Sequence, residues 1–137
     1  MGPALVAEAF RPLLLQSKDT YSLFVSSGQG TLVQNAARNA SANWNVRNVD
    51  AYVVSKAALN MLVALEYAEF GGKGLKVFAD SPWLVRSNLR GKSEQARSGW
   101  RVAGDADVAG ELVPSIVEGK WDTDTECLVH KDGVCAW

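Results

Sequence analysis

The sequence has 137 residues, 47% of them hydrophobic, and a formal net charge of −1. This length allows one domain at most, and the near-neutral charge without a run of like charges argues against nucleic acid or an anionic membrane as a partner. No apolar stretch approaches the length that a membrane span needs. We therefore expect one globular domain or a part of one.

The first predicted element is a helix over residues 3–17. Pro3 suits the first turn of a helix, whereas Pro12 should kink it or remove a backbone hydrogen bond. The apolar residues form two neighbouring stripes, with Leu5, Ala9 and Leu13 in one and Val6, Phe10 and Leu14 in the other. So wide an apolar face needs another element to cover it.

A short β-rich run at residues 21–26 predicts a buried strand, which ends in Ser26-Ser27-Gly28. Small hydroxyl residues and glycines just past the carboxyl end of a strand are where open α/β sheets place their ligands, although an ordinary Ser/Gly turn explains the same residues. Residues 31–49 show little periodicity, so we expect an irregular loop there.

Residues 50–70 predict a long helix that Asp50 caps and that Gly71-Gly72 ends. Tyr52 and Lys56 are four residues apart and therefore share a face of this helix. A nearby cation favours phenolate over phenol, and a tyrosine in such a pair can exchange a proton with a carbonyl or an alcohol oxygen. By itself the spacing is weak evidence, because a surface tyrosine and a solvated lysine give the same pattern.

The rest of the chain alternates strands and helices. Apolar residues of the long helix predict its buried stripe, namely Ala57, Ala58, Met61, Leu62, Leu65 and Ala68. A strand at 75–79 follows, then a loop over 83–103, a helix at 105–118 with Pro114 inside it, and a strand near 126–130. A helix, a tight glycine turn and a strand form a crossover unit, which indicates a parallel sheet.

Two cysteines lie near the end of the chain. Cys127 and Cys135 could form a disulfide, but without a secretory signal we expect two reduced thiols in a cytoplasmic protein. Their spacing matches no common zinc motif, so we predict no metal site.

Together these motifs resemble the short-chain dehydrogenase/reductase family. The resemblance covers residues 3–137 and rests on three features: Ser26-Ser27-Gly28 after a strand, the Tyr52 and Lys56 pair opening a long helix, and a strand that ends in a proline loop with Ser87-Asn88-Leu89. The final residues and the Asn-Leu-Arg-Gly stretch look most like fungal carbonyl-reductase-type members of secondary-metabolite pathways. The resemblance implies a Rossmann-like, three-layer α/β fold with a parallel sheet.

The resemblance also implies roles for individual residues. Tyr52 would be the catalytic acid/base, Lys56 would assist it and hold the ribose of the cofactor, and Ser27 would hydrogen-bond the substrate oxygen, with Ser26 as the alternative. The cofactor would be NADP, which supplies the hydride, and the substrate a small carbonyl compound or alcohol.

Residues 80–87 would face the nicotinamide, with Val85 and Ser87 as further cofactor-binding residues. Substrate specificity would lie in residues 83–103.

The sequence departs from the family pattern at its start. The family opens with a strand, a glycine-rich turn and a helix whose N-terminus receives the cofactor diphosphate. The sequence has no such fingerprint, since Gly28-Gln29-Gly30 follows the wrong strand, and Trp83 stands where relatives usually have glycine. We therefore expect residues 1–137 to be the C-terminal half of a domain, with weak or absent NADPH affinity and negligible reductase activity alone.

Two alternatives stay open. The chain could be a redox-inactive half-domain that acts as an interaction protein, or a cofactor-free acid/base catalyst that uses Tyr52 and Lys56. The unpaired edge of strand 21–26 and the uncovered side of helix 3–17 favour association. We accordingly expect a homo-oligomer formed through helices 3–17 and 50–70.

Overall fold

The computed structural model describes residues 2–38, 50–99 and 101–137. Its elements, in chain order, are α1 (Gly2–Leu14), β1 (Thr20–Val25), η1 (Gly28–Gly30), α2 (Leu32–Arg38), α3 (Asp50–Phe70), η2 (Gly71–Lys73), β2 (Leu75–Asp80), η3 (Asn88–Arg90), α4 (Glu94–Arg97), α5 (Ala106–Gly110), α6 (Leu112–Val117), η4 (Asp122–Asp124), β3 (Leu128–His130) and β4 (Gly133–Cys135). Each η element is a single turn of 3₁₀ helix.

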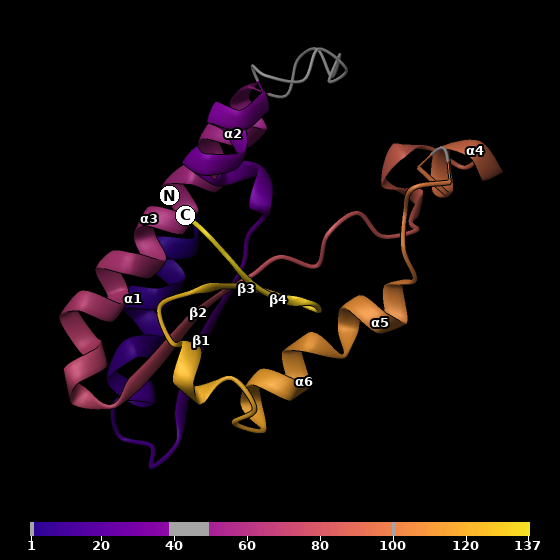
Figure 1. Cartoon of the computed structure of the whole chain (residues 1–137). Coiled ribbons are helices and arrows are strands. Elements are labelled where there is room, and N and C mark those ends of the chain that lie inside the picture. The colour runs from indigo at the N-terminus through magenta and orange to yellow at the C-terminus, as the bar shows by residue number, and fades with distance from the viewer. Residues whose placement is uncertain (1, 39–49, 100) are drawn as a thin grey trace.

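The strands form one sheet in the order β1-β2-β3-β4 (Figure 1). β1, β2 and β3 run parallel, which confirms the parallel strands predicted near 21–26, 75–79 and 126–130. β4 pairs antiparallel with β3. This strand was not predicted, because three residues are too few to show an alternating pattern.

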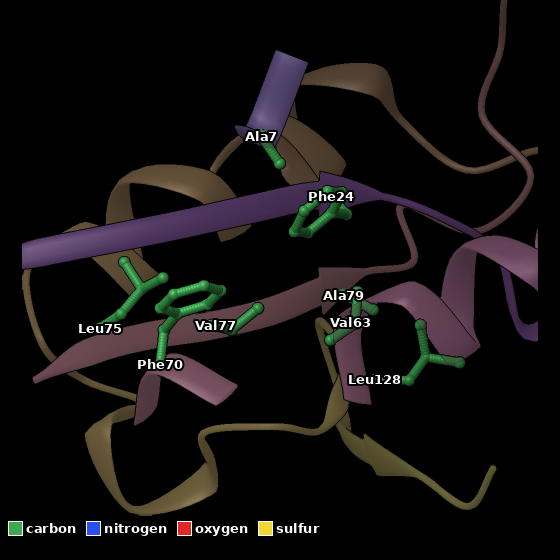
Figure 2. Close-up of a cluster of buried hydrophobic side chains, with 8 residues drawn as sticks. All are labelled: Ala7, Phe24, Val63, Phe70, Leu75, Val77, Ala79 and Leu128. Atoms are coloured by element: carbon green, nitrogen blue, oxygen red, sulfur yellow. The ribbon is translucent and has the colours of Figure 1, made fainter. Parts of the chain in front are cut away.

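Two apolar clusters cover the two faces of the sheet. One joins α1 and α3 to the strands and consists of Ala7, Phe24, Val63, Phe70, Leu75, Val77, Ala79 and Leu128 (Figure 2). The other packs Leu112 and Ile116 of α6 against Phe78 and Val129. Helices on both faces of a mainly parallel sheet make the predicted three-layer α/β architecture.

Helix α3 has the predicted bounds but a different buried face. Met61 and Leu65 are each 60% exposed, whereas the buried residues are Asn60, Val63, Glu66 and Phe70. The predicted stripe was therefore wrong, because α3 carries apolar residues all round and two of its buried positions are polar. Both polar residues have partners, and the Arg11 guanidinium donates to both carboxylate oxygens of Glu66, at 3.0 and 2.7 Å.

Three other predicted boundaries need correction. The first helix ends at Leu14, with Pro12 inside its last turn. The predicted loop at 31–49 contains helix α2, and its later residues lie outside the described part of the chain. The predicted helix at 105–118 is two helices, α5 and α6, and the break puts Pro114 into the first turn of α6, where no backbone N–H is needed.

Cys127 and Cys135 are free, and burial raises the pKa of both thiols.

Within residues 2–38, 50–99 and 101–137, no group of three acidic, histidine or cysteine side chains could hold a metal ion. None of the described helices is both long enough and apolar enough to cross a bilayer.

Candidate active site

The Tyr52 and Lys56 pair lies near the start of α3, beside the carboxyl end of β1. Lys56 Nζ lies 5.7 Å from the centre of the Tyr52 ring and donates a hydrogen bond to the Val25 carbonyl oxygen at 2.9 Å. The Tyr52 side chain is 47% exposed, and its hydroxyl has no hydrogen-bond partner among the described residues. The two residues therefore share one helix face, as their spacing predicts, and Lys56 connects that face to β1.

The two serines after β1 have different environments. Ser26 is buried and its hydroxyl donates a hydrogen bond to Asn60 Oδ1. Ser27 is half-buried, and its Oγ accepts the Gln29 N–H at 3.1 Å, which caps η1. The Ser27 hydroxyl therefore keeps its own proton for another acceptor, whereas the Ser26 proton is already used inside the protein.

Gly30 sets the distance between α3 and the turn after β1 that carries Ser26 and Ser27. A Cβ at this position would lie 2.5 Å from the Lys56 carbonyl carbon and 2.6 Å from the Ala57 nitrogen. Only glycine allows so close an approach of two backbones. This contact holds the turn that carries Ser27 directly against the backbone of Lys56.

Two further residues hold the strand ends together, and the sequence analysis did not single them out. Asn60 accepts from Ser26, and the Ser81 hydroxyl, just after β2, accepts the Gly28 N–H at 3.1 Å. Ser81 could have been found from its place after a predicted strand. Asn60 could not, because it falls on a side of α3 that apolar periodicity does not distinguish.

Asp80 ends β2 among apolar neighbours. It is 2% exposed, its register partners are Val25 and Val129, and its Oδ1 has no hydrogen-bond partner. Burial raises the pKa of this carboxyl to about 6. The carboxylate therefore carries a desolvation cost at neutral pH.

The structure does not bring Val85 and Ser87 together with Tyr52 and Lys56. The chain leaves the end of β2 and runs out toward α4, away from α3 (Figure 1). Val85 forms an isolated bridge with Gly104, and Ser87 caps η3. In the part of the chain that the structure describes, no hydrogen bond or ring contact joins either of them to Tyr52 or Lys56.

Trp83 keeps a backbone conformation that favours glycine. Its φ angle is +64°, in the left-handed region, and its side chain is 61% exposed with the ring centre 6.2 Å from that of His130. The position at which the family resemblance expects glycine therefore retains the backbone geometry and carries a tryptophan.

The segment predicted to set specificity contains a depression of about 610 Å³. Its walls are formed by Arg86, Glu94, Gln95, Ser98 and Arg101. Arg86 is already paired with Glu94 through two hydrogen bonds of 2.6 and 2.7 Å. All five residues that line the depression are polar or charged, and Tyr52 and Lys56 are not among them.

The donors at the site fit one end of a nicotinamide cofactor. The Lys56 ammonium has three N–H donors, of which Val25 takes one, and so it can bind ribose hydroxyls. The glycines after β1 do not offer a diphosphate cradle, because Gly30 faces the backbone of α3 and a Cβ at Gly28 would lie 3.0 Å from the Gln34 side chain. Residues for the diphosphate are therefore not found in the described part of the chain.

Comparison with curated proteins gives two fungal relatives that match almost the whole chain. The short-chain dehydrogenase/reductase tropE of Talaromyces stipitatus is 35% identical over 141 residues, which cover 96% of this chain and 53% of tropE. The short-chain dehydrogenase/reductase eupG of Phoma sp. is 34% identical over 99% of this chain and 54% of its own length. The chain thus spans about half the length of these relatives. No protein-family model matches the sequence.

Solved structures show the same fold. NADPH-bound carbonyl reductase from chicken fatty liver superposes with a TM-score of 0.77 at 22% identity, over 98% of this chain and 52% of its own. Carbonyl reductase Sniffer of D. melanogaster gives a TM-score of 0.66 at 21% identity and the same coverage. The 137 residues therefore share the fold of about half of each of these carbonyl reductases.

Proposed function

We propose that these residues form the proton-transfer half of an NAD(P)-dependent oxidoreductase that interconverts a ketone and an alcohol in a fungal secondary-metabolite pathway. One observation carries the proposal: the Lys56 ammonium lies beside the Tyr52 ring and also holds the carbonyl of Val25 at the end of β1, two residues before Ser27. The names of the fungal relatives support the reaction class.

The nicotinamide cofactor, when bound, supplies or accepts the hydride. Tyr52 presents an exposed hydroxyl that donates a proton to the carbonyl oxygen in reduction and takes one from the alcohol in oxidation. The positive charge of Lys56 stabilises the phenolate that remains after donation. Ser27, whose oxygen already accepts the Gln29 N–H, donates a hydrogen bond through its hydroxyl to the substrate oxygen and so orients the substrate.

Cofactor binding is divided between this chain and the remaining half of the fold. Lys56 would hold the ribose, and Val85 and Ser87 stay predicted contacts of the nicotinamide. A glycine turn at a helix N-terminus gives the diphosphate hydrogen bonds and a favourable dipole worth on the order of 1 kcal/mol each. We therefore expect the 137 residues alone to bind NADPH weakly and to show negligible reductase activity.

The test is an NADPH fluorescence titration and a ketone-reduction assay. Both are carried out on the chain alone and on the chain mixed with the part of tropE that it does not match. The mixture should bind NADPH and reduce ketones, and Lys56→Ala should lower kcat/KM by about 10²- to 10⁴-fold. Lys73→Ala, which removes an exposed lysine of η2, is the matched control and should leave the rate unchanged.

Two results would contradict the proposal. If the mixture binds NADPH but reduces no ketone in a broad panel, the chain is not the proton-transfer half of a reductase. If the chain alone binds NADPH tightly and Lys56→Ala abolishes that binding, the division of the cofactor site between two halves is wrong.

A further inference from the structure

The end of β1 is held to α3 by two residues that lie one turn apart on the helix. The Lys56 ammonium donates to the Val25 carbonyl oxygen at 2.9 Å, and Asn60 Oδ1 accepts the hydroxyl of Ser26. Positions four apart on a helix share a face, so the two contacts hold consecutive residues at the end of β1. Both of these residues come directly before Ser27 in the chain.

The two contacts differ in their exposure to water. Asn60 is 5% exposed and Ser26 is 3% exposed, whereas the hydrogen bond of Lys56 is open to solvent. Lys56 also has a second task in the proposed function, because its remaining donors would hold the cofactor ribose. A hydrogen bond inside a protein is electrostatically stronger than one in water. The bond between Asn60 and Ser26 therefore ties the end of β1 to α3 whether or not Lys56 is engaged elsewhere.

The Ser27 hydroxyl depends on the neighbouring residues for its place. Its oxygen accepts the Gln29 N–H at 3.1 Å, a contact within the same turn. In the described part of the chain, the nearest side-chain hydrogen bonds to other segments belong to its two neighbours, since Ser26 bonds to α3 and Gly28 bonds to Ser81. A shift of Ser26 would therefore carry Ser27 with it.

Asn60 is an unfavourable residue for packing alone. Leu59 and Val63 of the same helix pack in the apolar cluster under α1 and α3. The Asn60 amide nitrogen is buried and has no hydrogen-bond partner among the described residues. An unpaired buried donor destabilises a fold, whereas apolar groups of the same shape in place of both members of a buried hydrogen bond can be nearly neutral. Stability alone thus gives no reason for an asparagine at this position.

We propose that Asn60 is a positioning residue, whose hydrogen bond to Ser26 sets the place of the Ser27 hydroxyl relative to Tyr52 on the same helix. The proposal rests on the proposed function, in which Ser27 and Tyr52 act on one substrate oxygen. A small displacement of a positioned group can lower a rate by a factor of about 100. Loss of the hydrogen bond therefore slows the chemical step and leaves the cofactor contacts of Lys56 in place.

The test separates position from stability with two variants. The double variant Ser26→Ala, Asn60→Leu removes both members of the hydrogen bond, so its melting temperature should stay within about 4 °C of wild type. Mixed with the part of tropE that this chain does not match, it should reduce ketones with kcat lowered about 10- to 100-fold. Its affinity for NADPH should change by less than about twofold.

Val63→Ala is the matched control on the same helix. The Val63 side chain is fully buried, so its truncation should lower the melting temperature, and it should leave kcat at the wild-type value. Ser26→Ala, which adds no bulk to the core, gives the same comparison of rates if the double variant does not fold. A wild-type kcat in the variant that lacks the Ser26 hydrogen bond would overturn the proposal.

A second readout needs no activity. In the chain alone, hydrogen exchange at the Gln29 amide, which donates to Ser27 Oγ, should become about tenfold faster in the double variant. Exchange at Val77 of β2 should stay unchanged. If the wild-type mixture reduces no ketone, the proposed function fails, and the exchange at Gln29 then decides whether Asn60 positions Ser27. Unchanged exchange at Gln29 would overturn the proposal.

Discussion

The carboxyl end of strand β1 and its outer edge differ sharply in how completely they are packed. At its carboxyl end, Gly30 touches the backbone of α3 and Ser26 is buried against Asn60. Along its outer edge, Val6 and Phe10 are more than half exposed. The segments that carry Tyr52, Lys56 and Ser27 are thus closely packed against each other, whereas the outer edge of β1 leaves large apolar side chains exposed.

The most disruptive substitution on the packed side should be Gly30→Ala. The added Cβ meets the backbone at Lys56 and Ala57, which cannot move aside as a side chain can. We expect a loss of about 4 kcal/mol in the free energy of unfolding, measured by chemical denaturation. Gly72→Ala is the control, because a Cβ there meets nothing within 4 Å, and equal stability of the two variants would show that the close contact does not hold the turn.

The next effect concerns the ion pair that ties α1 to α3. Arg11→Ala removes the partner of the Glu66 carboxylate, which belongs to a residue only 4% exposed in the wild type, and this should cost about 3 kcal/mol. The double variant Arg11→Ala, Glu66→Ala should recover part of this loss, since it removes the unpaired charge. A double variant less stable than Arg11→Ala would show that burial of Glu66 is not what makes the pair necessary.

These two contacts also mark the limit of what the sequence predicted. The bounds of α3 followed from Asp50 and Gly71-Gly72, and the Tyr52 and Lys56 pair followed from helical spacing, because both are local signals. The contact at Gly30 and the buried face of α3 depend on which segments meet in space. Apolar periodicity pointed to Met61 and Leu65, whereas the fold buries Glu66, whose charge is neutralised by a residue 55 positions away.

Asp80 lies at the end of β2. Burial gives its carboxyl a pKa of about 6 in the folded state, which exceeds the ordinary value of 3.8. Protonation therefore stabilises the folded state, and this contribution is lost as the pH rises through about 6. We expect the free energy of unfolding to fall by about 1.3 kcal/mol between pH 5 and pH 7, and Asp80→Asn to remove this fall and to stabilise the protein at pH 7. Asp19→Asn, at an exposed turn, is the control, and an unchanged pH dependence in Asp80→Asn would refute the assignment.

The smallest effect is expected at Trp83, just beyond the packed strand ends. Trp83→Gly relieves a positive φ angle and gives up a largely exposed ring, so the protein should become more stable by about 1 kcal/mol. Trp83→Ala loses the ring but keeps the backbone cost, and it should be less stable than wild type in the same thermal melts. If Trp83→Ala is more stable than Trp83→Gly, the backbone at residue 83 is not strained.

Hydrogen exchange at adjacent amides of β1 tests the contrast between its two sides most directly. In the chain alone, the outward Leu23 amide should exchange fast and the Phe24 amide, which belongs to the opposite backbone edge, should exchange slowly. Equal protection of both amides in the monomeric chain would contradict an open outer edge of β1.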